Sequence, residues 1–315
     1  MRTHTTDHSR RYRARRSRTT PPWLLISVLA SAIIIGHVGA CAQSLVVDFT
    51  IGSFTSAVSL SVASTGEIFV LDAGSNACVR FSHDGTELSR VQGTGWGASE
   101  FDSPTDVSGS FPLAVFVSDG KNKRVLQFDK DLHSVQSIDD VQTTDGKEFE
   151  GLFIPIATAQ SLQGELFVLD ADGTRIVKFS TRFRAEHEFG TYASGEGRLN
   201  APTDLCMTED GRLAVADGTS IVYFDQFGNY LSRQTVDADE PIRTIASSNG
   251  DILAVSPTEI SVVSSSQEAT TAGSHVKAEM IVGESGVTFR DAARTDKYWL
   301  ILTPKTLLVC SRNNK

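Results

Sequence analysis

Two aspartates and two arginines have the residue types and spacing that best fit a binding site. They occupy one position of a segment that recurs six times along the chain, and the residues at that position are Ser59, Asp106, Ala157, Asp204, Arg243 and Arg290. Arginine holds carboxylate and phosphate groups with paired N–H donors. We therefore expect a shared site that binds an anionic ligand. Mutual neutralisation of the four charges is the alternative.

Aromatic residues in loops near these positions extend the candidate site. We include Trp96 in the expected ligand-binding set, and Phe101 and Tyr192 lie in loops nearby. An aromatic ring in such a loop either stacks on a ligand or covers the hydrophobic core. The sequence leaves both interpretations open.

A repeated hairpin positions these residues. Its fullest copy, Gly66–Phe81, reads as a strand at Glu67–Leu71, a polar turn that opens at Asp72 and a second strand at Cys78–Phe81. The turn recurs at Asp119, Asp170, Asp217, Ser256 and Thr303, with spacings of 47, 51, 47, 39 and 47 residues. Fifteen residues before the six turns lie Ala57, Pro104, Pro155, Pro202, Pro241 and Thr288, so proline leads four of the six repeats.

Four strands fit into each repeat. A proline-led first strand and the hairpin are followed by a fourth strand, as at Glu87–Val91 and Tyr230–Thr235. Repeats of about 40 to 50 residues with four strands are typical of propeller blades. The sequence thus predicts an all-β fold, a six-bladed β-propeller of four-stranded antiparallel blades over residues 43–315. Leu45–Ile51 precedes blade one without a hairpin, so we expect it to close the ring as the outer strand of the last blade.

These motifs resemble those of the NHL-repeat β-propeller family over roughly Leu45 to Ser311. Blade two carries the pattern nearly whole, from Pro104 through the segment DGKNKRVLQF that begins at Asp119. Blade three keeps the aspartate, arginine and phenylalanine of the motif, blade one has Ala77 where the family prefers arginine, and blade four is shorter there. Blades five and six keep only the hydrophobic pattern. The resemblance implies the propeller fold and leaves the function open.

Enzyme motifs are scarce in this chain. The sequences GxSxG, HExxH and the P-loop are absent, and the histidines beyond residue 42 are His83, His133, His187 and His275. We place all four away from the expected channel. Six-bladed lactonases and related calcium hydrolases use Glu, Asn and Asp in the channel, where this chain offers only Asp106 and Asp204 as candidates. We therefore expect no catalytic residues, and activity at the channel mouth is the alternative.

Neither a metal site nor a cofactor is expected. The turn-opening aspartates are interpreted as acceptors for backbone amides two or three residues further on, because their repetition indicates an architectural role. Cys78, Cys206 and Cys310 fall in strands of three different blades and lack the spacing of zinc ligands. We interpret them as buried single thiols.

The charge of the chain argues against a nucleic-acid partner. The formal net charge is −9, and residues 1–42 contribute seven arginines and one aspartate, so residues 43–315 carry 22 basic and 37 acidic residues, a net of −15. Binding to nucleic acid depends mainly on basic side chains that neutralise phosphates. We expect an unidentified protein or a small anionic molecule as partner, and a monomeric protein.

Residues 1–42 have the pattern of an export signal. The arginine-rich start is followed by an apolar run from Trp23 to Gly36 and then by small residues. Val38-Gly39-Ala40-Cys41 resembles a bacterial lipobox with Cys41 as the lipidated residue, whereas ordinary cleavage before Gln43 and an uncleaved membrane anchor are the alternatives. Together these features predict an exported, non-catalytic binding or scaffold propeller at the bacterial cell surface or in the periplasm, or freely secreted. A propeller hydrolase or lyase is the alternative.

Overall fold

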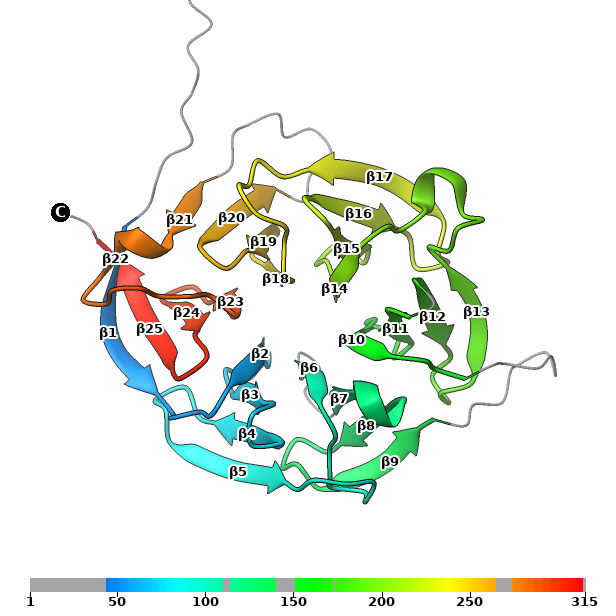
Figure 1. Cartoon of the computed structure of the whole chain (residues 1–315), viewed down its shortest axis with the longest axis horizontal. Coiled ribbons are helices and arrows are strands. Elements are labelled where there is room, and N and C mark those ends of the chain that lie inside the picture. Colours follow the sequence, from blue (N-terminus) through cyan, green and yellow to red (C-terminus); the bar gives the residue numbers. More distant parts are fainter. Residues whose placement is uncertain (1–43, 110–113, 140–150, 173, 265–273, 314–315) are drawn as a thin grey trace, which may run out of the picture. The chain divides into compact units, whose positions relative to one another are not determined.

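The computed structural model describes residues 44–109, 114–139, 151–172, 174–264 and 274–313. They form an all-β six-bladed propeller whose blades radiate from a central axis (Figure 1), as the repeat predicted. The expected export signal, with Cys41, lies outside the described residues. Within the described ranges, no helix is long and apolar enough to cross a membrane.

The first three blades follow one another along the chain, each built from inner to outer strand. Blade one contains β2 (Ala57–Val62), β3 (Ile68–Asp72), β4 (Ala77–Phe81) and β5 (Glu87–Gln92). Blade two contains β6 (Pro104–Ser108), β7 (Val115–Asp119), β8 (Arg124–Phe128) and β9 (Ser134–Ile138). Blade three contains β10 (Pro155–Gln160), β11 (Leu166–Asp170), β12 (Arg175–Phe179) and β13 (Ala185–Phe189).

Blades four and five repeat this order, and blade six is completed from the other end of the chain. Blade four contains β14 (Pro202–Met207), β15 (Leu213–Asp217), β16 (Ser220–Phe224) and β17 (Tyr230–Thr235). Blade five contains β18 (Thr244–Ser248), β19 (Asp251–Val255), β20 (Glu259–Ser264) and β21 (His275–Lys277). Blade six contains β23 (Asp291–Arg294), β24 (Trp299–Leu302), β25 (Leu307–Arg312), β1 (Leu45–Ile51) and β22 (Ile281–Val282). Short 3-10 turns occur at η1 (Gly120–Asn122), η2 (Gly195–Gly197) and η3 (Ala278–Met280).

Blade six closes the ring. Strand β1 pairs with β25 in antiparallel fashion, with Leu45 opposite Arg312 and Ile51 opposite Leu307. The N-terminal strand is therefore the outer strand of the last blade, as expected. The short strand β22 was not foreseen, and it pairs in parallel with the outer side of β1. This pairing covers part of an edge that would otherwise expose unpaired backbone groups.

The hydrophobic core lies in the six seams between neighbouring blades. Every residue of β3, β4, β7, β11, β12 and β15 is buried, because both faces of a blade pack against its neighbours. Each seam has its own cluster of buried side chains, as where Val70 of blade one and Leu300 of blade six share one cluster. Removing the packing at one seam therefore weakens two blades at once.

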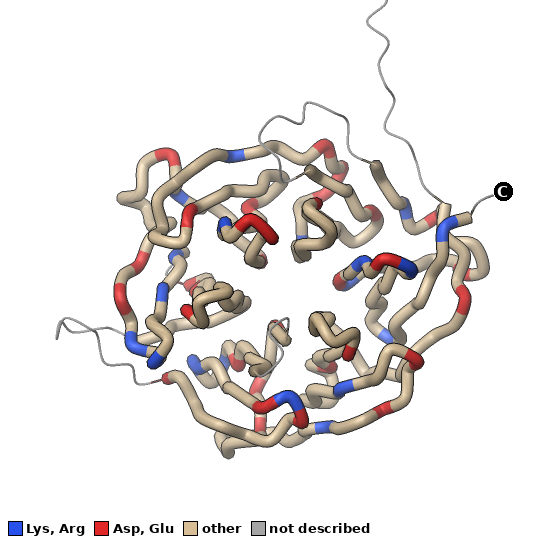
Figure 2. Tube along the Cα trace, turned by 180° about the vertical axis from the view of Figure 1, so that it is seen from behind, with Lys and Arg blue, Asp and Glu red and all other residues tan. Residues whose placement is uncertain are grey.

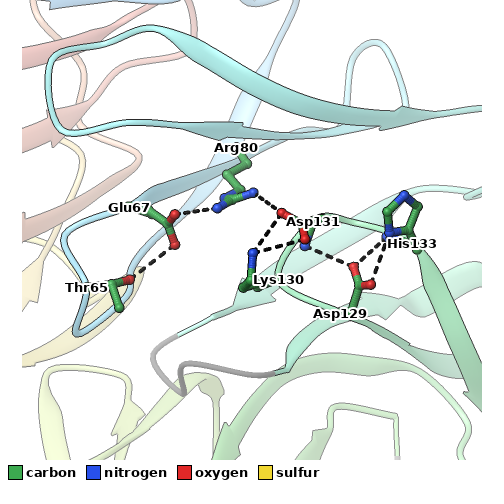
Figure 3. Close-up of polar contacts among 7 residues, drawn as sticks. All are labelled: Thr65, Glu67, Arg80, Asp129, Lys130, Asp131 and His133. Carbon is green, nitrogen blue, oxygen red and sulfur yellow. Dashed lines mark hydrogen bonds and ion pairs between the residues drawn. The ribbon is translucent and has the colours of Figure 1, made fainter.

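Ion pairs at the outer part of the ring also join blades. The buried Arg80 guanidinium of β4 contacts Glu67 within blade one and reaches Asp131 of blade two at 2.5 Å (Figure 3). Asp131 also receives the ammonium of Lys130 at 3.0 Å. This network supplements the apolar contact between blades one and two, at a place away from the central axis.

Candidate functional site

The turn-opening aspartates have the architectural role that was expected, with different partners. Asp72 accepts the backbone N–H groups of Thr55 and Ser56 at 2.8 and 2.6 Å, and these residues precede it by 17 and 16 positions. The amides at the same two offsets donate to Asp170 and to Asp217. The expectation of amides two or three residues further on was therefore incomplete. These carboxylates mainly anchor the loop that leads into the inner strand of their own blade.

The register assumed for blades five and six was wrong by one residue. In blades one to four a bulge follows the first residue of the inner strand, so Ser59, Asp106, Ala157 and Asp204 pair with the residue just before the turn. Blades five and six lack this bulge, and Thr244 and Asp291 make the corresponding pairs with Val255 and Leu302. Arg243 and Arg290 each lie one residue earlier. They are therefore not equivalent to Asp106 and Asp204.

The corrected register reveals a ring of alternating residues. We call the following six residues the inner ring: Ser59, Asp106, Ala157, Asp204, Thr244 and Asp291. Every second blade contributes an aspartate, and the blades between contribute a small residue. Asp291 was missed at the sequence level, although an aspartate in blades two, four and six was a detectable signal.

Each aspartate of the inner ring bridges its blade to the next. Asp106 Oδ2 accepts the amide of Thr158 in blade three at 2.9 Å, and Asp204 Oδ2 accepts the amide of Ile245 in blade five at 2.7 Å. Asp291 Oδ2 accepts the amide of Leu60 in blade one at 2.8 Å, across the seam that closes the ring. Three of the six seams are therefore joined near the axis by a carboxyl group.

Hydroxyl groups of the preceding blade complete two of these three bridges. Ser59 Oγ donates to Asp106 at 2.8 Å, and Thr244 Oγ1 donates to Asp291 at 3.0 Å. Ala157 stands at the third position and has no hydroxyl to offer Asp204. The seam between blades three and four thus lacks the bond that its counterparts have.

Burial raises the pKa of all three carboxyl groups of the inner ring. It raises the pKa of Asp106 to about 6, although hydrogen bonds from Thr158 and Ser59 oppose the rise. Burial raises the pKa of Asp291 to about 7. The pKa of Asp204 lies well above its ordinary value because of burial and, next, the charges of Asp106 and Asp291. The three groups therefore repel one another across the axis when ionised.

Arg243 and Arg290 lie at the start of neighbouring inner strands, at the end of the axis we call the channel mouth. Their backbone amides donate to Val255 at 2.7 Å and Leu302 at 2.8 Å, which fixes both residues. Burial lowers the pKa of Arg243, the positive charge of Arg290 lowers it further, and Glu240 partly opposes this. The Nε atom of each arginine is buried and finds no hydrogen-bond partner among the described residues. We call these two residues the arginine pair.

The arginine pair does not pair with the aspartates as the neutralisation hypothesis required. None of the ion pairs among the described residues includes Arg243, Arg290, Asp106 or Asp204. The carboxyl groups instead accept hydrogen bonds from backbone amides. The buried Nε–H donor of each guanidinium group has no hydrogen-bond partner among the described residues. An anion between the arginines would satisfy those donors.

The three aromatic residues differ in their exposure. Trp96 and Tyr192 are 68% and 81% exposed. Phe101 is fully buried and belongs to the hydrophobic cluster between blades one and two. The Trp96 ring lies 5.8 Å from the Arg124 guanidinium carbon, and the Tyr192 ring lies 4.2 Å from that of Arg198. Trp96 and Tyr192 therefore remain available for stacking, and Phe101 does not.

All four histidines lie outside the inner strands. His83 and His133 occupy the turns that follow β4 and β8, while His187 and His275 lie in the outer strands β13 and β21. His133 Nδ1 contacts Asp129 at 3.0 Å on the exposed surface (Figure 3). No imidazole of the described chain is thus placed beside the inner ring or the arginine pair.

A cleft of about 660 Å³ lies at the opposite end of β18 and β23 from the arginine pair. The turn Asn249–Asp251 and the segment Arg294–Trp299 line it. Arg294 is already bound there to Asp251 at 2.9 Å, so this cleft does not share the unsatisfied donors of the channel mouth.

The charges of the propeller are spread over the whole ring. Figure 2 shows basic and acidic residues interspersed along the chain around the blades. Within the described ranges, no group of three or more His, Cys, Asp and Glu side chains is arranged to hold a metal ion. Cys78 and Cys310 are buried and Cys206 is partly buried, and all three are free thiols.

No family model matches the chain, and no curated protein matches it in sequence. Solved structures with the same fold include a streptogramin B lyase, with a TM-score of 0.59 and 10% identity over 84% of this chain and 97% of that one. A catalytically inactive histidine-to-alanine variant of virginiamycin B lyase from Staphylococcus aureus, with quinupristin, gives 0.56 and 9% identity over 84% and 98%. A nidogen/laminin complex gives 0.52 and 12% identity over 66% and 76%. At these identities the likeness shows the fold alone.

Proposed function

We propose that this chain is an exported, non-catalytic binding propeller of the NHL type, acting as a binding or scaffold module at the bacterial cell surface or in the periplasm. Its ligand is a small anion or a protein partner that presents a carboxylate or phosphate at the channel mouth. Arg243 and Arg290 hold that group, and Trp96, which is exposed in the loop before β6, is proposed to contribute an aromatic surface. Asp106 and Asp204 lie in the inner ring, where their carboxyl groups hold backbone amides of the next blade.

One observation carries this proposal. Arg243 and Arg290 directly precede the neighbouring inner strands β18 and β23, and each has a buried Nε without a hydrogen-bond partner among the described residues. Each buried donor left unbonded costs roughly 1 to 3 kcal/mol, and two adjacent positive charges add repulsion. A bound carboxylate or phosphate removes both costs, because it accepts from two guanidinium groups at once.

The acidic charge of the protein supports a discrete anion site rather than an extended polyanion. A net charge of −15 over residues 43–315 repels nucleic acid at a distance, so we propose no nucleic-acid partner. A small anion that fits between the two arginines experiences mainly their local field. Selectivity for compact anions is therefore expected.

Isothermal titration of residues 43–315 with inorganic phosphate and with succinate tests this proposal. We expect saturable binding of at least one probe, and at least a tenfold loss of affinity in the variant Arg243→Ala/Arg290→Ala. The matched control is Arg182→Ala/Arg184→Ala, which removes the same charge from two exposed residues of another turn and should bind normally. Equal affinity of the channel-mouth variant and the parent would refute the proposal.

A propeller lyase or hydrolase with its active site at the same mouth is the second candidate. The lyases of the same fold favour it. The placement of all four histidines away from the inner strands favours the binding module. Incubation with quinupristin, followed by mass spectrometry, separates the two for that substrate: a binding module leaves its mass unchanged, and an altered mass would favour the lyase.

A further inference from the structure

We propose that the inner ring is a proton-operated lock on the closure of the propeller. When the carboxyl groups of Asp106, Asp204 and Asp291 are neutral, they hold neighbouring inner strands together near the axis. When they ionise, they repel one another and loosen the three seams that they bridge. This device is independent of the anion site, because it acts through the contacts between blades.

The geometry gives each carboxyl group a seam to control. The amides of Thr158, Ile245 and Leu60 each donate to an aspartate of the preceding blade, at 2.9, 2.7 and 2.8 Å. One of the three contacts joins blade six to blade one, where β1 from the N-terminal part of the chain completes the sheet. The lock therefore also acts on the seam between blades six and one, which closes the ring.

The hydroxyl partners allow the ring to remain bonded in both protonation states. A serine or threonine hydroxyl donates to a carboxylate and can instead accept from a carboxylic acid. Ser59 and Thr244 lie at 2.8 and 3.0 Å from Asp106 and Asp291 and can make this exchange. Asp204 has Ala157 at the corresponding position, so this exchange is not available to its carboxyl group.

Among the described residues, no ion pair joins a cation to an aspartate of the inner ring. The charges that raise the pKa of Asp204 are those of Asp106 and Asp291, and Asp106 also acts on Asp291. The thiol of Cys206 on β14 faces the charges of Asp204 and Asp291, and its pKa is raised mainly by burial. Arg243 and Arg290 precede Thr244 and Asp291 in sequence, and neither makes an ion pair with the ring among the described residues. Asp72, Asp119, Asp170 and Asp217, at the turns, hold loops rather than seams.

The direction of the response follows from the raised pKa values. Between the unfolded pKa, about 3.9, and the folded values of about 6 for Asp106 and about 7 for Asp291, the folded state binds more protons than the unfolded state. The stabilisation is fully present below this window and is lost as the pH rises through it. The closed ring is therefore favoured in mild acid.

Thermal unfolding of residues 43–315 between pH 5 and pH 8 tests the lock. We expect the Tm to fall by about 5 °C or more over this range, because the carboxyl groups of the inner ring lose protons that folding had favoured. Asp204→Asn should flatten this dependence by at least a third. Asp72→Asn is the matched control: hydrogen bonds outweigh burial and lower the pKa of Asp72, so its loss should reduce stability while keeping the slope between pH 5 and 8.

Two measurements on the unmodified chain keep the proposal testable if a variant fails to fold. Carbon-13 NMR of the aspartate carboxyl groups should show three that titrate above pH 5. Hydrogen exchange of the amides of Leu60, Thr158 and Ile245 should accelerate between pH 6 and pH 8 beyond the intrinsic increase, relative to the amide of Val70 within blade one. A Tm that is constant or rises with pH, or aspartates that all titrate below pH 4.5, would overturn the proposal.

Discussion

Asp204 accepts the amide of Ile245 across the seam between blades four and five at 2.7 Å, while Ala157 in blade three offers it no second bond. The two equivalent aspartates each receive a hydroxyl from the preceding blade. The inner ring is thus complete at two positions and incomplete at the third. This difference makes the ring testable one residue at a time.

Ala157→Ser should complete the ring. By analogy with Ser59, the new hydroxyl should donate to Asp204, lower its pKa and raise the free energy of unfolding at pH 8 by about 1 kcal/mol. The gain should be smaller at pH 5, where a neutral carboxyl group accepts more weakly. Urea unfolding at both pH values measures the difference.

Ala159→Ser is the control for that substitution. Ala159 is buried two residues further along β10, so its new hydroxyl should leave the pKa of Asp204 and the pH dependence of stability unchanged. If both substitutions changed stability equally, the bond to Asp204 would not be the cause.

The arginine pair predicts an unusual sign for a charge-removing substitution. Arg290→Gln should leave stability unchanged or raise it by up to about 1 kcal/mol at low salt, because it relieves the repulsion with Arg243. Arg294→Gln in the same blade should be destabilising, because Arg294 is bonded to Asp251 at 2.9 Å. Chemical unfolding at low and high sodium chloride compares them, and a clear destabilisation by Arg290→Gln would contradict the unsatisfied pair.

Closure of the ring by β1 can be tested by truncation. Removing residues 43–52 deletes Leu45 and Ile51, which are 0% and 2% exposed, and opens the edge of β25. We expect a loss of more than about 3 kcal/mol and a less cooperative transition, since each buried aliphatic side chain contributes roughly 1.5 to 3 kcal/mol. A truncated chain that melted like residues 43–315 would show that closure contributes little.

The proposed export signal predicts a defined mature N-terminus. If the lipobox is used, Cys41→Ser should release the protein from membranes into the soluble fraction. Ordinary cleavage predicts no change and an N-terminus at Gln43. Intact-mass spectrometry of protein from the native host distinguishes lipidated, cleaved and uncleaved chains.

The sequence predicted the blades because strand and turn signals repeat in every one of them. Proline at the first inner-strand position and aspartate at the turn are local signals, and they pair in the structure, as Pro104 does with Asp119. The inner ring depends on whether a bulge follows that proline. Blades five and six lack the bulge, and β18 and β23 begin at Thr244 and Asp291, three residues after Pro241 and Thr288. A fixed offset therefore selected Arg243 and Arg290 instead of Thr244 and Asp291.

The binding site itself was only partly predictable. The adjacency of Arg243 and Arg290 follows from their blades, and the positive charge of Arg290 adds to burial in lowering the pKa of Arg243. That their Nε atoms stay unbonded depends on side-chain packing that no spacing rule contains. The amide partners of Asp106 and Asp204 likewise come from neighbouring blades, which only the closed ring brings together.

Nitrogen-15 NMR of the arginine side chains tests the anion site most directly. The Nε–Hε signals of Arg243 and Arg290, assigned with single Arg→Lys variants, should shift together and saturably as phosphate or succinate is added to residues 43–315. Those of Arg182 and Arg184, which are exposed, should stay nearly constant. Signals from Arg243 and Arg290 that stay unmoved across the full titration with both anions would contradict the proposed site.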